Sequence, residues 1–473
     1  MIAAFAAIFV LSLALALLSR RGGVKQRAED FFVASGQFGV VLFFFLAVGE
    51  TYSITSVLGY PGGIYANGLS FVTWFLGYIV LAFVLGYFLN PLIWRAGRLR
   101  GAVTLPDLLG RHFNSRALEI VVALAALLFL VPLGMQQFLG LEIVLKALGT
   151  AVSPLLLAAI AGACAFAYIA ISGIRASAYV AILKDILLVL AILVTAIAAT
   201  RQWSEGADPA LASAATKRVM QPTLKGDVFA ITTILLQSAG FSMAPQICAS
   251  IFTARSASAV RRAQITMPLY MLMFPFLTVV AYYGLGHVSH IDTANALFPL
   301  VAGMLLPPPL VGGVLAAAAL SALVVLTGIC LAIGPLVTRN LIPGLGNNQQ
   351  RQWSKLVMVL YLLLSIAGAA TSSQLMVTIN NLYYFGMTQF LPGMLGVLFL
   401  DRMRPGAIIA GIIAGDAIAF LLFQFAIPLG GINPGLIGLA VNLAIVFATL
   451  RLAPGEARIP VRPVRQNALR QNA

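Results

Sequence analysis

Long apolar runs constrain this chain more than any other feature of its sequence. Runs of about 17 to 25 residues recur between Ile2 and Leu452, and each is long enough to cross the hydrocarbon core of a membrane as a helix. Only 9% of the 473 residues are charged and 61% are hydrophobic, whereas soluble domains carry about 25% charged residues. The short alternating segments of a membrane β-barrel are absent from the sequence. The sequence therefore predicts an all-α polytopic membrane protein.

Helix breakers and charge clusters divide the apolar sequence into about thirteen predicted spans. The first span has no basic segment before it and no small-residue cleavage site after it, so we expect a retained helix rather than a cleaved signal peptide. No phosphate-binding loop occurs, and the whole chain, 1–473, is predicted to be a single transmembrane domain. The predicted spans are 2–19, 38–58, 69–93, 117–146, 153–173, 177–199, 228–249, 265–286, 309–337, 354–372, 375–400, 405–426 and 435–452.

The distribution of basic residues predicts how the helices are oriented. With the amino terminus outside, most of the 29 lysines and arginines fall on the cytoplasmic side, as the positive-inside rule requires. We therefore expect a multi-pass protein of the cell or inner membrane, with the amino terminus outside and the carboxyl terminus in the cytoplasm. Topology then explains the net charge of +15, the basic tail 453–473 lies near anionic lipid, and no nucleic-acid partner is expected. The exceptions are Lys184, inside a span, and on the outer side Lys146, Arg201, Lys217, Arg218 and Lys225.

Glycine and proline interrupt two of the predicted spans. Gly49 and a following Gly/Pro cluster interrupt the second span, and Gly240 and Pro245 interrupt the seventh. Irregular backbone inside a membrane is tolerated only where protein or a water-filled cavity satisfies its polar groups. The two segments lie five helices apart, which suits two inverted five-helix repeats, 38–199 and 228–400, with one extra helix before them and two after. Two ordinary kinked helices are the alternative interpretation.

Five motifs in a fixed order resemble the sodium:solute symporter family. They are SVLGYPGGIYANG, RLRGAVTLPDLLGRHFNSRAL, SGIRASAYVAILKD, APQICASIFTARSASAVRRA and GMTQFLPGMLGVLF. The resemblance covers roughly residues 30 to 425, and the segments GETYS, GIRA, LKD and LVTRN are most similar to the monocarboxylate-permease-like branch. It implies a leucine-transporter-type inverted repeat, alternating access, and uptake of a small solute driven by a cation gradient.

The sequence departs from the family where the family binds sodium. The resemblance places Thr51 where sodium-coupled members have an aspartate, Ala181 where they have a second one, and Val324 and Val325 at a pair of hydroxyl residues. Sodium is a hard cation that prefers several oxygen ligands, so these replacements put its site in doubt. The hydroxyls that remain nearby on the ninth span belong to Ser321 and Thr327.

Lys184 and Asp185 lie inside the sixth span, where an ion is costly unless it faces a cavity or a partner. Lys184 follows Ala181 by three residues and so lies on the same helical face. We hypothesise that its ammonium replaces the missing sodium and holds the half-helices together, and that its protonation is the coupling step. The alternatives are a static ion pair with Glu50 or Asp185, or a side chain that reaches back to the cytoplasmic boundary.

The candidate site residues lie at the two breaks, on the fourth span and on the ninth. Glu50 marks the first break, where it could coordinate a cation, transfer a proton or pair with Lys184. Gln137 matches a glutamine that lies near the solute in the family, or else it forms an interhelical hydrogen bond. The predicted substrate-binding residues are Glu50, Thr51, Tyr52, Ser53, Gln137, Gln237, Ser238 and Ser242, and the predicted ion-coupling residues are Gly49, Glu50, Lys184, Ser321 and Thr327.

These features predict a secondary active transporter that takes up a small organic solute together with a cation. A lysine at the site and the positive ends of half-helix dipoles favour an organic anion, of which a monocarboxylate is the expected example. The alternatives are a sodium-coupled symporter of a sugar, an amino acid or urea, and a non-transporting membrane sensor. No catalytic constellation indicates an enzyme. We expect no cofactor and no metal site, sodium or a proton as the coupling ion, and the solute and the lipid bilayer as partners; no oligomeric state is predicted.

Overall fold

The computed structural model describes residues 1–18, 28–149, 156, 159–160, 162–167, 173–203, 213, 223–372, 374–400, 402–452 and 455. Within these residues all regular elements are helices. Eight helices are long and apolar enough to cross a membrane, or up to ten if each of two bent pairs counts as one span. The structure therefore confirms a multi-pass helical protein. The count of thirteen spans stays a prediction, because span 153–173 and the tail 453–473 lie largely outside the described residues.

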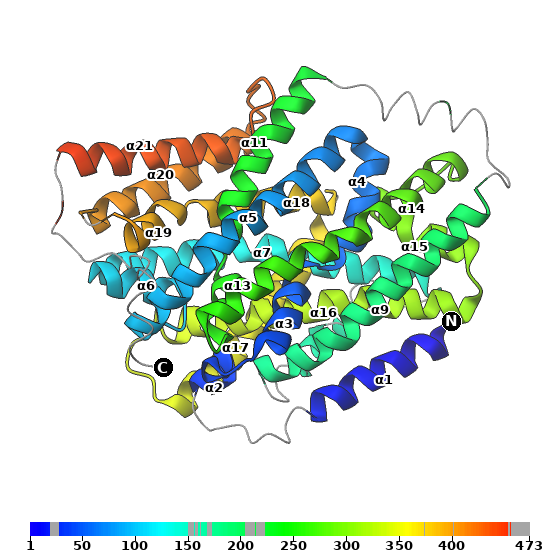
Figure 1. Ribbon diagram of the computed structural model, residues 1–473, viewed down its shortest axis with the longest axis horizontal. Coiled ribbons are helices and arrows are strands. Elements are labelled where there is room, and N and C mark those ends of the chain that lie inside the picture. The colour runs from blue at the N-terminus through cyan, green and yellow to red at the C-terminus, as the bar shows by residue number, and fades with distance from the viewer. Residues whose placement is uncertain are drawn as a thin grey trace.

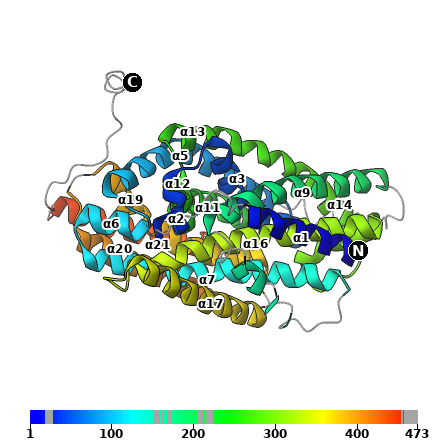
Figure 2. The ribbon, with the colours of Figure 1, turned by 90° about the horizontal axis from the view of Figure 1, so that it is seen from below.

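The long helices follow the apolar runs of the sequence. α5 (Leu69–Arg100), α7 (Arg116–Ala147), α9 (Ile174–Arg201) and α16 (Pro308–Thr338) contain 28 to 32 residues each, enough to span a bilayer with some tilt. α16 is the central helix, because its apolar window is completely buried and it packs against both α9 and α7. Figure 2 shows it between these two helices.

Other helices surround this centre. α1 (Ile2–Leu18) packs on α16 and α9, whereas α20 (Pro405–Gln424) and α21 (Pro434–Leu452) pack on each other at the opposite edge (Figure 1). The remaining elements are α2 (Ala28–Val33), α6 (Leu105–Phe113), α13 (Ala257–Thr266), η4 (Met267–Leu272), α14 (Met273–His287), η5 (Ala294–Ala296), α15 (Leu297–Leu305), α17 (Asn347–Thr371), α18 (Met376–Thr388) and α19 (Leu391–Leu398).

Two spans are broken, as predicted, although Gly49 and Gly240 themselves lie within helices that end at Thr51 and Phe241. α3 (Val40–Thr51) is followed after a gap by η3 (Thr55–Gly59) and α4 (Tyr60–Asn67), with a bend of 49°, and α11 (Leu224–Phe241) is followed by α12 (Pro245–Thr253), with a bend of 44°.

The predicted end of the second span at residue 58 is wrong, because the helix continues to Asn67. Pro61 lies in the first turn of α4, where a proline removes no helical hydrogen bond. Gly62 lets α4 approach η5, since a Cβ there would meet the Ala294 carbonyl oxygen at 2.6 Å. The Gly/Pro cluster therefore serves close packing rather than ending the span.

The two broken spans meet at the centre of the molecule. α3 packs against α9, α12 and α16, and α12 also packs against α16 and α5. The segment before α3 is joined to the end of α12, because Phe38 N–H donates to the Thr253 carbonyl and Arg255 N–H donates to the Phe38 carbonyl, both at 2.9 Å. The backbone gaps of α3 and α11 thus lie among the buried helices, where protein can satisfy them.

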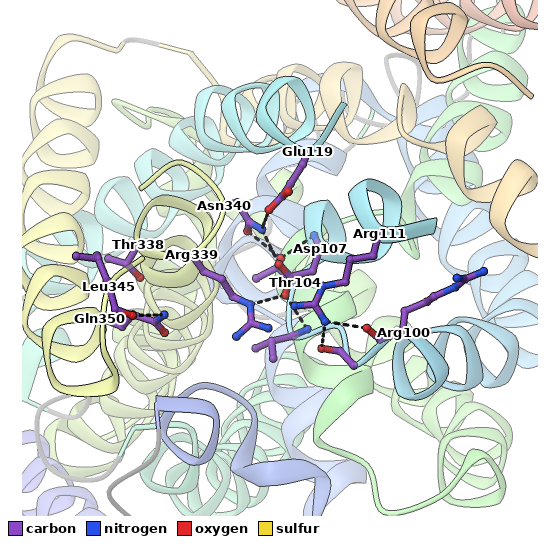
Figure 3. Close-up of polar contacts among 12 residues, drawn as sticks. Arg100, Thr104, Asp107, Arg111, Glu119, Thr338, Arg339, Asn340, Leu345 and Gln350 are labelled. Atoms are coloured by element: carbon purple, nitrogen blue, oxygen red, sulfur yellow. Dashed lines mark hydrogen bonds and ion pairs between the residues drawn. The ribbon is translucent and has the colours of Figure 1, made fainter. Parts of the chain in front are cut away.

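A buried carboxylate, Asp107, ties α6 to the residues that follow α16 (Figure 3). It accepts hydrogen bonds from Arg339 Nε and Asn340 Nδ2, both at 2.7 Å, and from the Val103 N–H at 3.0 Å. Thr104 caps α6, because its hydroxyl accepts from the Asp107 N–H and donates to Asn340 Oδ1. These contacts join residues more than 230 positions apart in the chain.

Candidate functional site

The Lys184 side chain lies at the end of α3, where the helix breaks. Its Nζ donates to the carbonyl oxygens of Tyr52 at 3.2 Å and Gly49 at 3.5 Å. These carbonyls are at the carboxyl end of α3, where helical C=O groups lack partners and carry the negative end of the helix dipole. Nζ also forms an ion pair with Asp185 Oδ1 at 2.5 Å, and both side chains are 0% exposed. Lys184 therefore binds the end of α3 from α9.

This geometry excludes two of the alternatives for Lys184, namely an ion pair with Glu50 and a side chain that reaches the membrane boundary. The ion pair is with Asp185 rather than Glu50, and a completely buried ammonium does not reach back to the membrane boundary. The pair with Asp185 accounts for one of the three ammonium donors, and the two carbonyls of α3 account for the others.

Ala181 and Val324, which the resemblance aligns with sodium ligands of the family, lie close to the same place. A Cβ at Gly49 would lie 3.0 Å from Ala181 Cβ and 3.3 Å from Val324 Cγ1, so α3, α9 and α16 approach closely here. Ser321 and Thr327 are buried on α16, where each hydroxyl donates to a carbonyl of its own helix, four residues earlier. Within the described residues no group of three or more His, Cys, Asp or Glu side chains could hold a metal ion.

A small polar cavity of about 50 Å³ lies beside the break in α3. A cavity of this size holds water, but it is smaller than the roughly 300–1,000 Å³ of a typical ligand pocket. We call this space the central cavity. It is lined by Glu50, Thr51, Ser53, Thr55, Ser56, Phe75, Tyr78, Leu133, Phe241, Gln246, Ile247, Val325, Asn380, Tyr383 and Tyr384.

Glu50 is the acidic residue of the central cavity. Its side chain is 8% exposed, and Oε2 has no hydrogen-bond partner. Gly328 of α16 leaves room for the carboxylate, because a Cβ there would lie 2.7 Å from Glu50 Oε1. No lysine, arginine or histidine lines the cavity within the part of the chain that the structure describes.

Five of the predicted substrate-binding residues do not line the central cavity. The Tyr52 ring stacks on Tyr270, with 5.4 Å between ring centroids, and only its backbone carbonyl takes part in the site. Gln137 donates to the Leu133 carbonyl of its own helix. Ser242 lies at the α11–α12 break, where its backbone carbonyl accepts from the Cys248 thiol.

Gln237 and Ser238 of α11 also lie away from the cavity. The Gln237 side chain donates to Asn381 Oδ1 at 2.8 Å, and the Ser238 hydroxyl donates to the Leu235 carbonyl. Both residues are buried. Gln237 thus joins α11 to α18, whereas the Ser238 hydroxyl bonds within α11.

Several residues that line the central cavity were not predicted from the sequence. Gln246, the second residue of α12, donates from Nε2 to the Tyr383 hydroxyl at 2.7 Å. Asn380, Tyr383 and Tyr384 lie on α18 at positions i, i+3 and i+4, a spacing that puts them on one helical face. This polar face in the sequence NNLYYFG was the signal that would have identified them.

Gln136 rather than Gln137 contacts a cavity residue. Its Oε1 accepts a hydrogen bond from the Thr55 hydroxyl at 2.9 Å. Its Nε2 is buried without a partner, so a donor remains next to the cavity wall. The fourth predicted span therefore does supply a glutamine to this region, but it is Gln136 and not the predicted Gln137.

Comparison with known proteins covers nearly the whole chain. The profile of the sodium:solute symporter family matches residues 31–415. The uncharacterized symporters YhjB and YodF of Bacillus subtilis (strain 168) are 26% and 27% identical to the chain, covering 93% and 91% of it and 94% and 88% of their own lengths. A monocarboxylate transport permease protein of Rhizobium johnstonii (strain DSM 114642 / LMG 32736 / 3841) is 27% identical over 94% of each chain.

Two solved structures share the fold. A Na⁺-coupled sialic acid symporter in a substrate-bound outward-open state superimposes with a TM-score of 0.78 and 17% identity, covering 96% of this chain and 99% of that one. MhsT in complex with L-phenylalanine gives a TM-score of 0.54 and 14% identity, covering 86% and 97%. These likenesses confirm the leucine-transporter-type helical fold.

Proposed function

Because the chain belongs to the sodium:solute symporter family, and is therefore a multi-pass membrane symporter, we propose that it imports a monocarboxylate together with a proton. In this proposal the Lys184 ammonium takes the place of the sodium ion. The solute binds in the central cavity and reaches it by alternating access, so that the cavity opens to one side of the membrane at a time.

The position of Lys184 Nζ carries this proposal. It donates to the Gly49 and Tyr52 carbonyls, beside the two valines that stand where the family has hydroxyl ligands. A sodium ion at the same carbonyls would meet the ammonium at contact distance, and like charges this close repel strongly in a buried site. The ammonium supplies the positive charge permanently, which favours coupling to a proton over coupling to sodium.

The start of α12 supports an organic anion as the solute. The first hydrogen bond within α12 runs from the Cys248 N–H to the Ala244 carbonyl, so the N–H groups of Gln246 and Ile247 precede it, and both residues line the central cavity. Free N–H groups at a helix start, with the positive end of its dipole, favour a carboxylate. The permease of Rhizobium johnstonii is named as a monocarboxylate transporter, which agrees with this solute class.

Two further elements of the proposal concern the arrangement in the membrane. We take 38–199 and 228–400 as inverted repeats, since each begins with a bent pair of helices. The amino terminus is placed outside and the carboxyl terminus in the cytoplasm, which puts the network around Asp107 and Arg339 on the cytoplasmic side.

Uptake measurements in proteoliposomes test the proposed function. At a membrane potential clamped with potassium and valinomycin, we expect an inwardly directed proton gradient to drive uptake of radiolabelled lactate or pyruvate. Replacing all sodium with choline should leave this uptake unchanged, because no sodium ion takes part.

Empty liposomes and excess unlabelled glucose, alanine or urea serve as controls. Uptake that follows a sodium gradient and ignores a proton gradient would refute the proposal. Competition by a sugar, an amino acid or urea, without competition by short carboxylates, would replace the proposed solute class with that of the successful competitor.

A further inference from the structure

We infer that Glu50 is the proton-binding residue of this symporter, and that its protonated carboxyl group donates a hydrogen bond to the carboxylate of the bound solute. The inference rests on the proposed function and specifies which residue couples the proton to the solute. It follows from the charge of the central cavity and from the position of Glu50 within it.

Glu50 is placed to touch the solute directly. It lies one residue before the end of α3 and is one of the residues that line the central cavity, and its Oε2 is buried without a hydrogen-bond partner. A buried polar atom without a partner is costly, so such an atom in a ligand cavity indicates a partner that arrives with the ligand. Gly328 provides the space that the carboxyl group occupies.

The charged groups around Glu50 do not neutralise it. α9 contributes Lys184 and Asp185, which neutralise each other at 2.5 Å. α16 and α12 carry no Asp, Glu, Lys, Arg or His in their described sequences.

The remaining neighbours of α3 and of the cavity supply no cation either. α13 carries Arg261 and Arg262, both exposed, and Arg261 lies over the Tyr87 ring of α5. The other ionisable groups near the site are Cys248 of α12 and the tyrosines Tyr270 of η4, Tyr78 of α5, and Tyr383 and Tyr384 of α18. An ionised Glu50 would thus be a buried charge without a counter-ion, which proteins avoid by protonation.

A carboxylate solute strengthens this conclusion. The start of α12 at Gln246 and Ile247 offers the N–H groups that receive an anion, in a cavity of about 50 Å³ that also contains Glu50. Two carboxyl groups confined to so small a space share one proton, because two adjacent negative charges cannot both be stable there. The solute anion therefore binds together with a proton on Glu50, and this is the coupling step.

Lys184 is less suited to carry the coupling proton. It does not line the central cavity, and its side chain is 0% exposed. Loss of its proton would leave Asp185 as an uncompensated buried charge and would release both carbonyls of α3. In this view Lys184 positions the break, whereas Glu50 exchanges the proton. One proton then accompanies one monocarboxylate anion, and transport is electroneutral.

The Glu50→Gln variant tests the inference, because glutamine resembles the protonated acid and cannot release a proton. For the natural protein, we expect solute affinity to fall about tenfold for each pH unit above the point where Glu50 ionises. E50Q should bind with an affinity that does not change with pH. It should exchange labelled for unlabelled solute across proteoliposomes, yet lose all accumulation driven by a proton gradient. Binding by calorimetry and flux by radiolabel give the two readouts.

Glu142→Gln is the matched control, since Glu142 pairs with the exposed Lys146 and lies outside the site; it should behave as the natural protein. E50Q that still accumulates solute with a proton gradient, or that still binds with the natural pH dependence, would overturn the inference and leave Lys184 as the proton carrier. A folded E50Q that no longer binds would overturn it too, since the solute would then need the ionised carboxylate.

A second measurement needs no variant. The natural protein should move one proton per solute, and its uptake at a fixed proton gradient should not change when the membrane potential is varied. Uptake that responds to the potential would overturn the inference. If the natural protein instead transports with sodium and without protons, the proposed function itself fails, so the two failures are distinguishable.

Discussion

Replacement of Lys184 by methionine is expected to abolish concentrative uptake and to lower the free energy of unfolding by about 3–5 kcal/mol. Methionine keeps the approximate volume of the side chain but removes the ammonium. Asp185 would then be buried without its partner, and the carbonyls of Gly49 and Tyr52 would lose their donor. The unfolding free energy can be measured by denaturant titration in detergent micelles, and uptake in proteoliposomes.

Two comparison variants separate the contributions of charge and position. Lys184→Met combined with Asp185→Asn removes the unpaired charge, so it should recover much of the stability without recovering uptake. Lys146→Met disrupts a pair in which the lysine side chain is 59% exposed, so we expect a change below about 1 kcal/mol. Normal uptake by the Lys184→Met variant would show that the ammonium does not replace a coupling ion.

Replacement of Asp107 by alanine is expected to destabilise the protein by about 3 kcal/mol, because a buried acceptor of three hydrogen bonds is removed. Arg339 Nε and the Val103 N–H lose this acceptor, and Asn340 Nδ2 keeps only its bond to Glu119 (Figure 3). The same loss leaves the Thr104–Asn340 hydrogen bond to join the start of α6 to the residues after α16. The change in unfolding free energy and faster protease cleavage near residue 104 are the measurements.

Asp292→Ala is the matched control for this variant. The Asp292 side chain is 98% exposed, and surface substitutions of this kind change stability by less than about 0.5 kcal/mol. Asp107→Asn keeps one acceptor oxygen and should lie between alanine and the natural residue. Equal stability of the Asp107→Ala and Asp292→Ala variants would show that the network contributes nothing measurable.

The apolar pattern predicted the eight long apolar helices of the described residues, because burial in lipid requires continuous apolar helices. The two broken spans were likewise visible from their glycines and prolines, although the first break follows Thr51 and leaves Gly49 within α3. Asn67, the true end of the second predicted span, was not visible, because Pro61 can either follow a helix or begin one. That choice depends on the contact with Ala294, more than 200 residues later.

Site residues could be predicted only where their spacing within a single helix places them on the same face. Lys184 was identified from its spacing to residue 181 on the same face of α9, and its carbonyl partners lie on the neighbouring break. Gln136 and Gln137 differ by one residue, which turns the side chain by about 100° around the helix. Neither composition nor family motif decides which of the two faces the centre. Gln246 and Tyr383 meet only because α12 and α18 pack together.

The attachment of the ammonium to α9 has a consequence for where such a transporter can work. A dissolved ion must be collected from the surroundings each time it is used, and its occupancy follows its concentration outside. The Lys184 ammonium is tethered by its own side chain beside the Gly49 and Tyr52 carbonyls, so its effective concentration there is set by the length of the tether. The hydrogen bonds from Lys184 to the end of α3 are therefore equally present at low and at high salt concentration.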